Sequence, residues 1–334
     1  MFAPSTTWPP SRIIAIILLS SISSLTSAQT DNGNECSCFQ TNGSSAGYFT
    51  SHRFLDYRNV PSVSPEVPAL LPNITNATNA FATSEFFTND AWRNDWAIQN
   101  WNNSDDVASG DSPTLRVNSP NNIYIEKQRH RPLLHNLPHP PHRPPPHLPI
   151  NRRNRLHGKK LPLPIGALPR PRNRLPGRCA GIFTYRHAAA SPSSVQEADI
   201  EILTRGARNA VQYTNQPSQD APEATRNVTV PQGRDWTAWN TYRVDWMPGM
   251  SSWYVDGVGV AEIGFQAPRD PAGLCVNMWS DGGGVDGEYE YIQWVEVVFN
   301  TSGPYAGPTD KREIAKRKGE KEKEKGCKVV WWGR

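Results

Sequence analysis

The stretch Gln196-Glu197-Ala198-Asp199-Ile200-Glu201-Ile202-Leu203 alternates acidic or polar residues with apolar ones. A period of two is typical of a β-strand with one face on a hydrophobic core, because successive side chains point to opposite faces of a sheet. We therefore predict a strand that turns Ala198, Ile200 and Ile202 toward the core. The carboxylates of Glu197, Asp199 and Glu201 then share the opposite face.

Further strand-like runs surround this stretch, with no helical periodicity between them. They cover residues 180–185, 209–214, 241–246, 252–255, 274–279 and 291–299. Shorter runs, separated by turns rich in proline and asparagine, occupy residues 38–126. So many short strands predict an all-β fold of packed antiparallel sheets.

Residues 127–178 break this pattern with thirteen prolines, thirteen Lys or Arg residues and no acidic residue. Proline cannot donate to a sheet ladder, and the segment has little apolar surface to bury. We predict that it interrupts the sandwich as a disordered or loosely polyproline-like segment. It is either a basic insertion or a mistranslated stretch, and the second reading is favoured because the strand pattern resumes abruptly at Cys179.

The formal net charge of +4 comes from this segment, since the rest of the chain carries 22 basic and 31 acidic residues. A basic chain would ordinarily suggest a nucleic-acid partner. The segment, however, has no aromatic residue on which a base could stack, and its histidines lack carboxylate or thiolate companions that would define a metal site. We expect no nucleic-acid partner, no metal and no cofactor.

Residues 1–28 have the layout of a signal peptide, with Arg12, an apolar run over residues 13–19 and small residues up to Ala28. The run is too short to span a bilayer, so no stable membrane insertion is expected. We predict a secreted monomer, located outside the cell or in the cell wall, with a charged, disordered tail over residues 301–334. Six Asn-x-Ser/Thr sequons agree with export: Asn42, Asn73, Asn76, Asn102, Asn227 and Asn300.

The five cysteines, at positions 36, 38, 179, 275 and 327, are too few for a dense disulfide framework. Cys179 and Cys275 are the preferred pair, because both fall in strand-like runs. The odd count leaves one thiol over.

The acidic strand suggests chemistry. Neighbouring side chains on one strand face lie about 7 Å apart, so three buried carboxylates repel one another. Repulsion keeps one carboxyl protonated as a general acid while another stays ionised as a nucleophile, and retaining glycoside hydrolysis needs such a pair. The alternative is an outer-face strand whose charges are simply solvated.

The motif Glu197-Ala198-Asp199-Ile200-Glu201 is followed by Trp239-Asn240-Thr241-Tyr242-Arg243-Val244-Asp245-Trp246-Met247-Pro248-Gly249 and by Trp253-Tyr254-Val255-Asp256-Gly257. In this order the motifs resemble glycoside hydrolase family 16. The resemblance implies a concanavalin A-like β-jelly roll over residues 36–300, with a cleft on its concave sheet. It also implies Glu197 as nucleophile, Glu201 as acid/base and Asp199 as an assisting acid.

Four further residues match cleft-lining positions of the family: Tyr185, His187, Asn277 and Trp279. An aromatic ring on that face can stack on a pyranose ring. Most of the other aromatic residues of the motifs are expected to pack inside the sandwich, and none of them is placed in the site: Trp239, Tyr242, Trp246, Trp253 and Tyr254.

The implied partner is a β-glucan polysaccharide, cleaved at internal β-1,3/1,4-glucosidic bonds through a covalent glycosyl-enzyme. Three readings stay open at this point. The chain is a hydrolase, a cell-wall transglycosylase with the same nucleophile, or a catalytically dead glucan-binding module.

Overall fold

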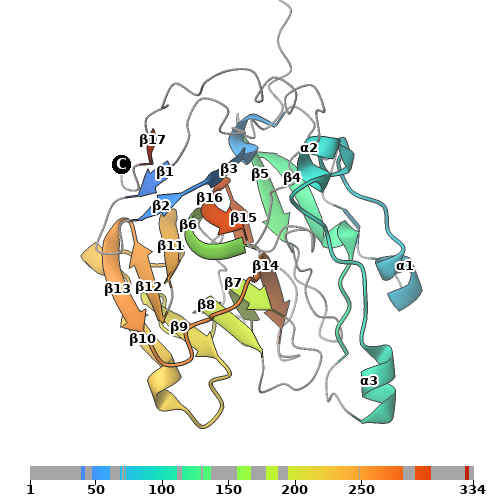
Figure 1. Cartoon of the computed structure of the whole chain (residues 1–334). Helices are drawn as coiled ribbons and strands as arrows, with labels where there is room; N and C mark the ends of the chain where they lie inside the picture. The colour runs from blue at the N-terminus through green and yellow to red at the C-terminus, as the bar shows by residue number, and fades with distance from the viewer. Residues whose placement is uncertain are drawn as a thin grey trace, which may run out of the picture.

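The computed structural model describes residues 39–41, 47–60, 68–69, 71, 73–110, 115–128, 131–136, 156–166, 178–186, 195–247, 249–280, 290–301 and 328–330. The expected signal peptide (1–28) and His187 lie outside the described residues, as do Cys36, Cys38 and Cys327. Within the described residues strands dominate and the helices are short (Figure 1).

A five-stranded antiparallel sheet carries the acidic stretch that predicts the fold. Its strands follow the order β10-β9-β8-β7-β14. They are β7 (Arg178–Arg186), β8 (Gln196–Leu203), β9 (Ala210–Gln216), β10 (Thr225–Thr229) and β14 (Gly273–Ser280).

A second, larger sheet packs against the first. Its order is β13-β12-β11-β6-β15-β5-β4, and β16 joins β6 to β3. The strands are β3 (Ser51–Asp56), β4 (Ile123–Gln128), β5 (Arg131–Asn136), β6 (Leu156–Gly166), β11 (Asn240–Met247), β12 (Met250–Val255), β13 (Val258–Ile263), β15 (Glu290–Ile292) and β16 (Trp294–Thr301). A small third sheet joins β17 (Lys328–Val330), β1 (Phe39–Thr41) and β2 (Tyr48–Phe49).

The helices are single turns or little more, and α1, α2 and α3 lie to one side of the sheets in Figure 1. The α-helices are α1 (Ile74–Thr78), α2 (Asp90–Arg93) and α3 (Ser104–Ser109). The 3₁₀ turns are η1 (Tyr57–Asn59), η2 (Glu85–Thr88), η3 (Pro120–Asn122), η5 (Pro222–Ala224) and η6 (Pro231–Gly233). None of these described helices has the length and apolar character needed to cross a membrane.

The hydrophobic core lies between the two large sheets. Ala198, Ile200 and Ile202 of β8 are buried in one cluster with residues of β11 and β12, among them Val244 and Trp253. The rings of Tyr213 on β9 and Trp253 on β12 lie 5.7 Å apart and connect the sheets. Burying a large apolar side chain contributes roughly 1.5–3 kcal/mol. The predicted all-β jelly-roll sandwich is confirmed, and its core is built from the apolar half of each alternating strand.

The segment 127–178 differs from its prediction where it is described. Strands β5 and β6 lie inside it, and β6 pairs with β11, β15 and β16 in the larger sheet. The prediction that this segment forms no strands is therefore wrong for residues 131–136 and 156–166. Pro162 and Pro164 fall where β6 is paired with β11 alone, so their missing N–H groups need not interrupt a second ladder. The composition of the segment did not reveal these two strands, because their formation depends on pairing with strands far away in the sequence.

Two other predictions are corrected by strand register. No disulfide joins Cys179 and Cys275, since β7 and β14 pair Cys179 with Trp279 and Cys275 with Phe183. An offset of four residues separates the two cysteines by about 13 Å along the strands, beyond the reach of a disulfide. In the tail, β17 pairs in parallel with β1, so residues 328–330 are not the disordered chain that was expected.

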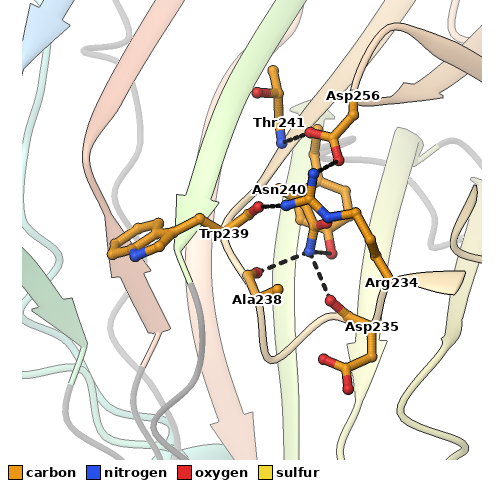
Figure 2. Close-up of polar contacts among 8 residues, drawn as sticks. Arg234, Asp235, Ala238, Trp239, Asn240, Thr241 and Asp256 are labelled. Carbon is orange, nitrogen blue, oxygen red and sulfur yellow. Dashed lines mark hydrogen bonds and ion pairs between the residues drawn. The ribbon is translucent and has the colours of Figure 1, made fainter. Parts of the chain in front are cut away.

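Polar contacts hold the turn that precedes β11, where the recognised aromatic motif begins. Arg234 forms an ion pair with Asp256 at 2.8 Å, and the Asn240 amide donates to two backbone carbonyls of the preceding turn, each at 2.9 Å. Figure 2 shows the Trp239 indole pointing away from these contacts. Trp239 is 36% exposed and is the one of the five motif aromatics that is not buried. Tyr242, Trp246 and Trp253 are buried as expected, while Tyr254 is buried on the other face of the larger sheet, against Arg243.

Candidate active site

Strand β8 presents its three carboxylates on the face opposite the core, as its alternation predicts. Ala198, Ile200 and Ile202 are fully buried in the core cluster. Glu197, Asp199 and Glu201 occupy the intervening positions and therefore share the other face. Asp199, the middle carboxylate, is only 3% exposed. A solvated outer-face strand would leave it open to water, so the simple structural alternative does not describe this residue.

Strand register assembles further side chains around the carboxylates. On the β9 side, Gln212 pairs with Glu201, Thr214 with Asp199 and Gln216 with Glu197. In an antiparallel sheet, directly paired residues project to the same face. The acidic row of β8 therefore lies beside a row of amides and a hydroxyl on β9.

The opposite neighbour, β7, brings the predicted aromatic and a glycine. Tyr185 pairs with Glu197, and Gly181 pairs with Glu201. Beyond β7, β14 places Asn277 opposite Gly181 and Trp279 opposite Cys179. Three of the four predicted binding residues, Tyr185, Asn277 and Trp279, thus share the face of the carboxylates.

The hydrogen bonds to the carboxylates come from amides and a hydroxyl rather than from cations. Gln212 Nε2 donates to Glu201 Oε2 at 2.7 Å, and Thr214 Oγ1 donates to the same oxygen at 3.5 Å. Gln216 Nε2 donates to Asp199 Oδ2 at 3.1 Å. Neutral donors orient carboxylates without neutralising their charge.

Burial without cations raises the pKa of each carboxyl group. Burial raises the pKa of Glu197 to about 7; the hydrogen bond with Asp199 opposes this rise, and the charge of Glu201 adds to it. Burial is also the main cause of the raised pKa of Glu201, against which Gln212 and Thr214 act. A proton held at such a site is available for general acid catalysis near neutral pH.

Asp199 is the carboxyl that keeps its proton most firmly. Burial first, and then the charges of Glu197 and Glu201, raise the pKa of Asp199 well above its ordinary value. Its hydrogen bond with Glu197 raises the pKa of Asp199 and lowers that of Glu197, so the shared proton belongs to Asp199. Protonated Asp199 then donates to Glu197 and favours the ionised form of Glu197.

The predicted binding residues differ in exposure. Trp279 is 37% exposed, which leaves ring surface for a ligand, while Asn277 is buried. Tyr185 is half-buried, and burial and the charge of Glu197 raise the pKa of its hydroxyl, which stays protonated as a donor. His187 lies outside the described residues.

Three residues that sequence reasoning missed complete this face. Gln212 and Gln216 hold Glu201 and Asp199, and their alternation with Thr214 along β9 was a readable signal. Gly181 is the third, because a Cβ at this position would lie 2.7 Å from Asn277 Oδ1. The side chain of Asn277 therefore occupies space that only glycine leaves free.

Cys179 also lies on this face, close to Glu201. Cys179 Sγ lies 4.0 Å from Glu201 Oε1, and burial together with the charge of Glu201 raises the pKa of the thiol. In the part of the chain that the structure describes, no group of three His, Cys, Asp or Glu residues is arranged to hold a metal ion.

A pair of carboxyl groups on one face is the arrangement with which glycoside hydrolases cleave a glycosidic bond. Comparison with known proteins gives no matching family model. The chain is 42% identical over 73 residues to a β-glucanase of Paenibacillus polymyxa, covering 19% of this chain and 31% of that protein. It is 30% identical over 135 residues to a β-glucanase of Paenibacillus macerans, covering 37% of this chain and 54% of that protein.

The chain thus spans between a third and about half of the length of the curated relatives it matches. Among solved structures, the β-glucanase of Bacillus licheniformis is 18% identical, with a TM-score of 0.45 over 61% of this chain and 92% of that one. The sequence matches fit an assignment to glycoside hydrolase family 16.

Proposed function

We propose that the chain is a retaining glycosidase that hydrolyses internal β-1,3/1,4-glucosidic bonds of cell-wall-type β-glucan through a covalent glycosyl-enzyme. One observation carries the proposal. Glu197, Asp199 and Glu201 share one buried face of β8, with raised pKa values and neutral hydrogen-bond partners. Both curated relatives are β-glucanases, which supports β-glucan as the substrate class.

In the first step, ionised Glu197 attacks the anomeric carbon of the bound sugar. Glu201 gives its proton to the glycosidic oxygen, so the C–O bond breaks and the leaving saccharide departs as a neutral alcohol. Asp199 donates a hydrogen bond to Glu197, which favours the carboxylate that must attack. Gln212 and Thr214 hold Oε2 of Glu201 and thereby set the orientation of its carboxyl group.

In the second step, Glu201 acts as a base. It takes a proton from water, whose oxygen attacks the anomeric carbon and releases Glu197 as a carboxylate. Two displacements on the same carbon retain the β configuration. A sugar hydroxyl in place of water would give transglycosylation.

The remaining residues of this face supply binding. Trp279 offers exposed ring surface for stacking on a pyranose. Asn277, seated over Gly181, brings an amide to the level of Glu201 in the sheet. Tyr185 brings a neutral hydroxyl beside Glu197. Together they would orient a sugar across β8.

The direct test is hydrolysis of soluble mixed-linkage β-glucan, followed by reducing-sugar release and by proton NMR of the first-formed anomer. We expect β product from the wild type and none from Glu197→Gln. Glu262→Gln, a matched carboxyl-to-amide change on β13 in the other large sheet, should keep full activity. Binding of the glucan without any cleavage by the wild type would contradict the proposal and select a glucan-binding module. Addition of an acceptor oligosaccharide separates hydrolysis from transfer.

We also propose that the chain is exported and glycosylated. In addition to the N-terminal sequence, the exposure of three sequon asparagines supports this: Asn73, Asn76 and Asn227. Expression in a eukaryotic secretory host should yield protein in the medium whose mass falls on treatment with an N-glycan amidase. Retention inside the host cell without any mass change would contradict export.

A further inference from the structure

The amide of Gln216, at the end of β9, is bonded at both ends. Its Nε2 donates to Asp199 Oδ2 at 3.1 Å. Its Oε1 accepts from the Ser218 backbone N–H at 3.0 Å and from the Ser218 hydroxyl at 2.8 Å. Rotating the amide by half a turn would set its NH₂ group against two donors. Ser218 therefore fixes which end of the Gln216 amide faces Asp199.

The orientation of the Gln216 amide determines which of the two carboxyl oxygens of Asp199 can carry the proton. Oδ2 accepts from Gln216, so the proton of a neutral Asp199 belongs on Oδ1. Oδ1 is buried, and no donor reaches it among the described residues. A buried carboxyl oxygen that accepts no hydrogen bond is better satisfied when it carries the proton and donates it to an acceptor. The acceptor here is Glu197, the neighbouring carboxylate with which Asp199 shares a hydrogen bond.

We propose that Gln216, held by Ser218, is a positioning residue that keeps the proton of Asp199 on Oδ1 and so directs it to Glu197. For catalysis the inference rests on the proposed function, since it concerns preparation of the nucleophile. For the proton itself, it rests on the bonds that fix the Gln216 amide, on the buried Oδ1 of Asp199 and on the hydrogen bond between Asp199 and Glu197.

The other titratable groups around this pair are acidic. Glu201 lies on β8, and its charge raises the pKa of Glu197 and Asp199. On β7, Tyr185 and Cys179 have raised pKa values and stay neutral. Cys275 on β14 acts on Tyr185, and Glu290 on β15 acts on Cys179. None of these described groups supplies a positive charge to Glu197, which leaves the proton of Asp199 as its principal aid.

The test is the titration of Glu197 in the full chain without substrate. Carbon NMR of protein labelled at the glutamate side-chain carboxyls follows each group, and the spectrum of Glu197→Gln assigns the resonance. In Gln216→Leu the Asp199 proton is no longer confined to Oδ1, so the pKa of Glu197 should rise by about one unit, the value of a charge-assisted hydrogen bond. Ser218→Ala removes one of the two bonds that hold the amide, and should give a smaller rise in the same direction.

Gln212→Leu is the matched control, because it removes an amide from the same face of β9 but from Glu201. It should move the titration of Glu201 and leave that of Glu197 nearly in place. An unchanged Glu197 titration in both Gln216→Leu and Ser218→Ala overturns the inference, and so does an equal shift of Glu197 in Gln216→Leu and Gln212→Leu. If Gln216→Leu does not fold, Ser218→Ala decides alone. Since no substrate is involved, these results hold even if β-glucan hydrolysis fails.

Discussion

Strands β8 and β11 both bury an aspartate, but the charge of its carboxylate is neutralised in different ways. On β11, Arg243 binds Asp245 through two hydrogen bonds of 2.6 Å, and the residues are 4% and 0% exposed. On β8, Asp199 is buried to a similar degree, but its partners are another carboxyl group and an amide. One buried carboxylate is neutralised by a cation; the other is neutralised by a proton.

This difference in how the buried charge is neutralised indicates a structural role for β11 and a functional role for β8. In a buried ion pair each charge is compensated by its partner, so the pair needs no ligand and serves the structure of the sheet. Carboxyls that stay buried without a cation reduce stability at neutral pH, and such a cost is typical of sites where chemistry requires raised pKa values. We therefore expect changes on β8 to alter activity, and changes on β11 to alter stability.

The largest effect is expected at Glu201. In Glu201→Ala, turnover of β-glucan should fall by about 10³-fold or more, because the departing sugar oxygen loses its proton donor. An aryl β-glycoside with a good leaving group should suffer less in the first step. Azide should then restore turnover and give a β-glycosyl azide, identified by NMR. Equal losses on both substrates without azide rescue would contradict the acid/base role.

On β11, Asp245→Ala leaves the Arg243 guanidinium buried without its carboxylate. The free energy of unfolding in urea should drop by about 3–5 kcal/mol, as for other broken buried pairs. Turnover per folded molecule, measured at a temperature where the variant is folded, should match that of the wild type. A loss of turnover comparable to that of Glu201→Ala would abolish the distinction between the two strands.

The next effect concerns stability and pH. Glu197 has a pKa of about 7 in the folded chain against 4.5 as its ordinary value, so between these pH values the folded state binds more protons than the unfolded state. The contribution of Glu197 to the free energy of unfolding is therefore most favourable below pH 4.5, and it falls by up to about 3 kcal/mol as the pH rises through 7. Urea unfolding of Glu197→Gln across this range should show a flatter decline than the wild type. Parallel curves would show that Glu197 is not the group responsible.

The smallest effect is expected from Gly181→Ala. The new Cβ would lie 2.7 Å from Asn277 Oδ1, so the Asn277 side chain must move away from its place over Gly181. We expect about a tenfold loss in kcat/KM, mainly through KM, because a binding contact is displaced. Gly259→Ala on β13 is the control, since its Cβ would meet the Tyr254 ring at an ordinary 3.6 Å. Equal kinetics for both variants would remove Asn277 from the binding face.

The alternation of β8 was enough to predict the shared face of the three carboxylates, because this depends on the local period of two. The sandwich was predicted from the many strand-like runs together, and the jelly roll was implied by the family resemblance. Register was not predictable in this way. The missed strands β5 and β6, the wrong Cys179–Cys275 pair and the seat of Asn277 over Gly181 all depend on which residues of distant segments lie opposite one another. Sequence did not show which motif aromatic is exposed, because the turn before β11 directs Trp239 outward.

The covalent glycosyl-enzyme is the most direct test of the roles given to β8. The folded chain is incubated with a 2-deoxy-2-fluoro-β-cellotriosyl fluoride. Its 2-fluorine slows both displacements, while its good leaving group speeds the first, so the glycosyl-enzyme accumulates. Mass spectrometry of the intact protein and of its peptides then locates the sugar. We expect one added glycosyl group, on Glu197, and none in Glu197→Gln. A label on Glu201, or release of α product without any labelled protein, would contradict the assignment of Glu197 as the nucleophile.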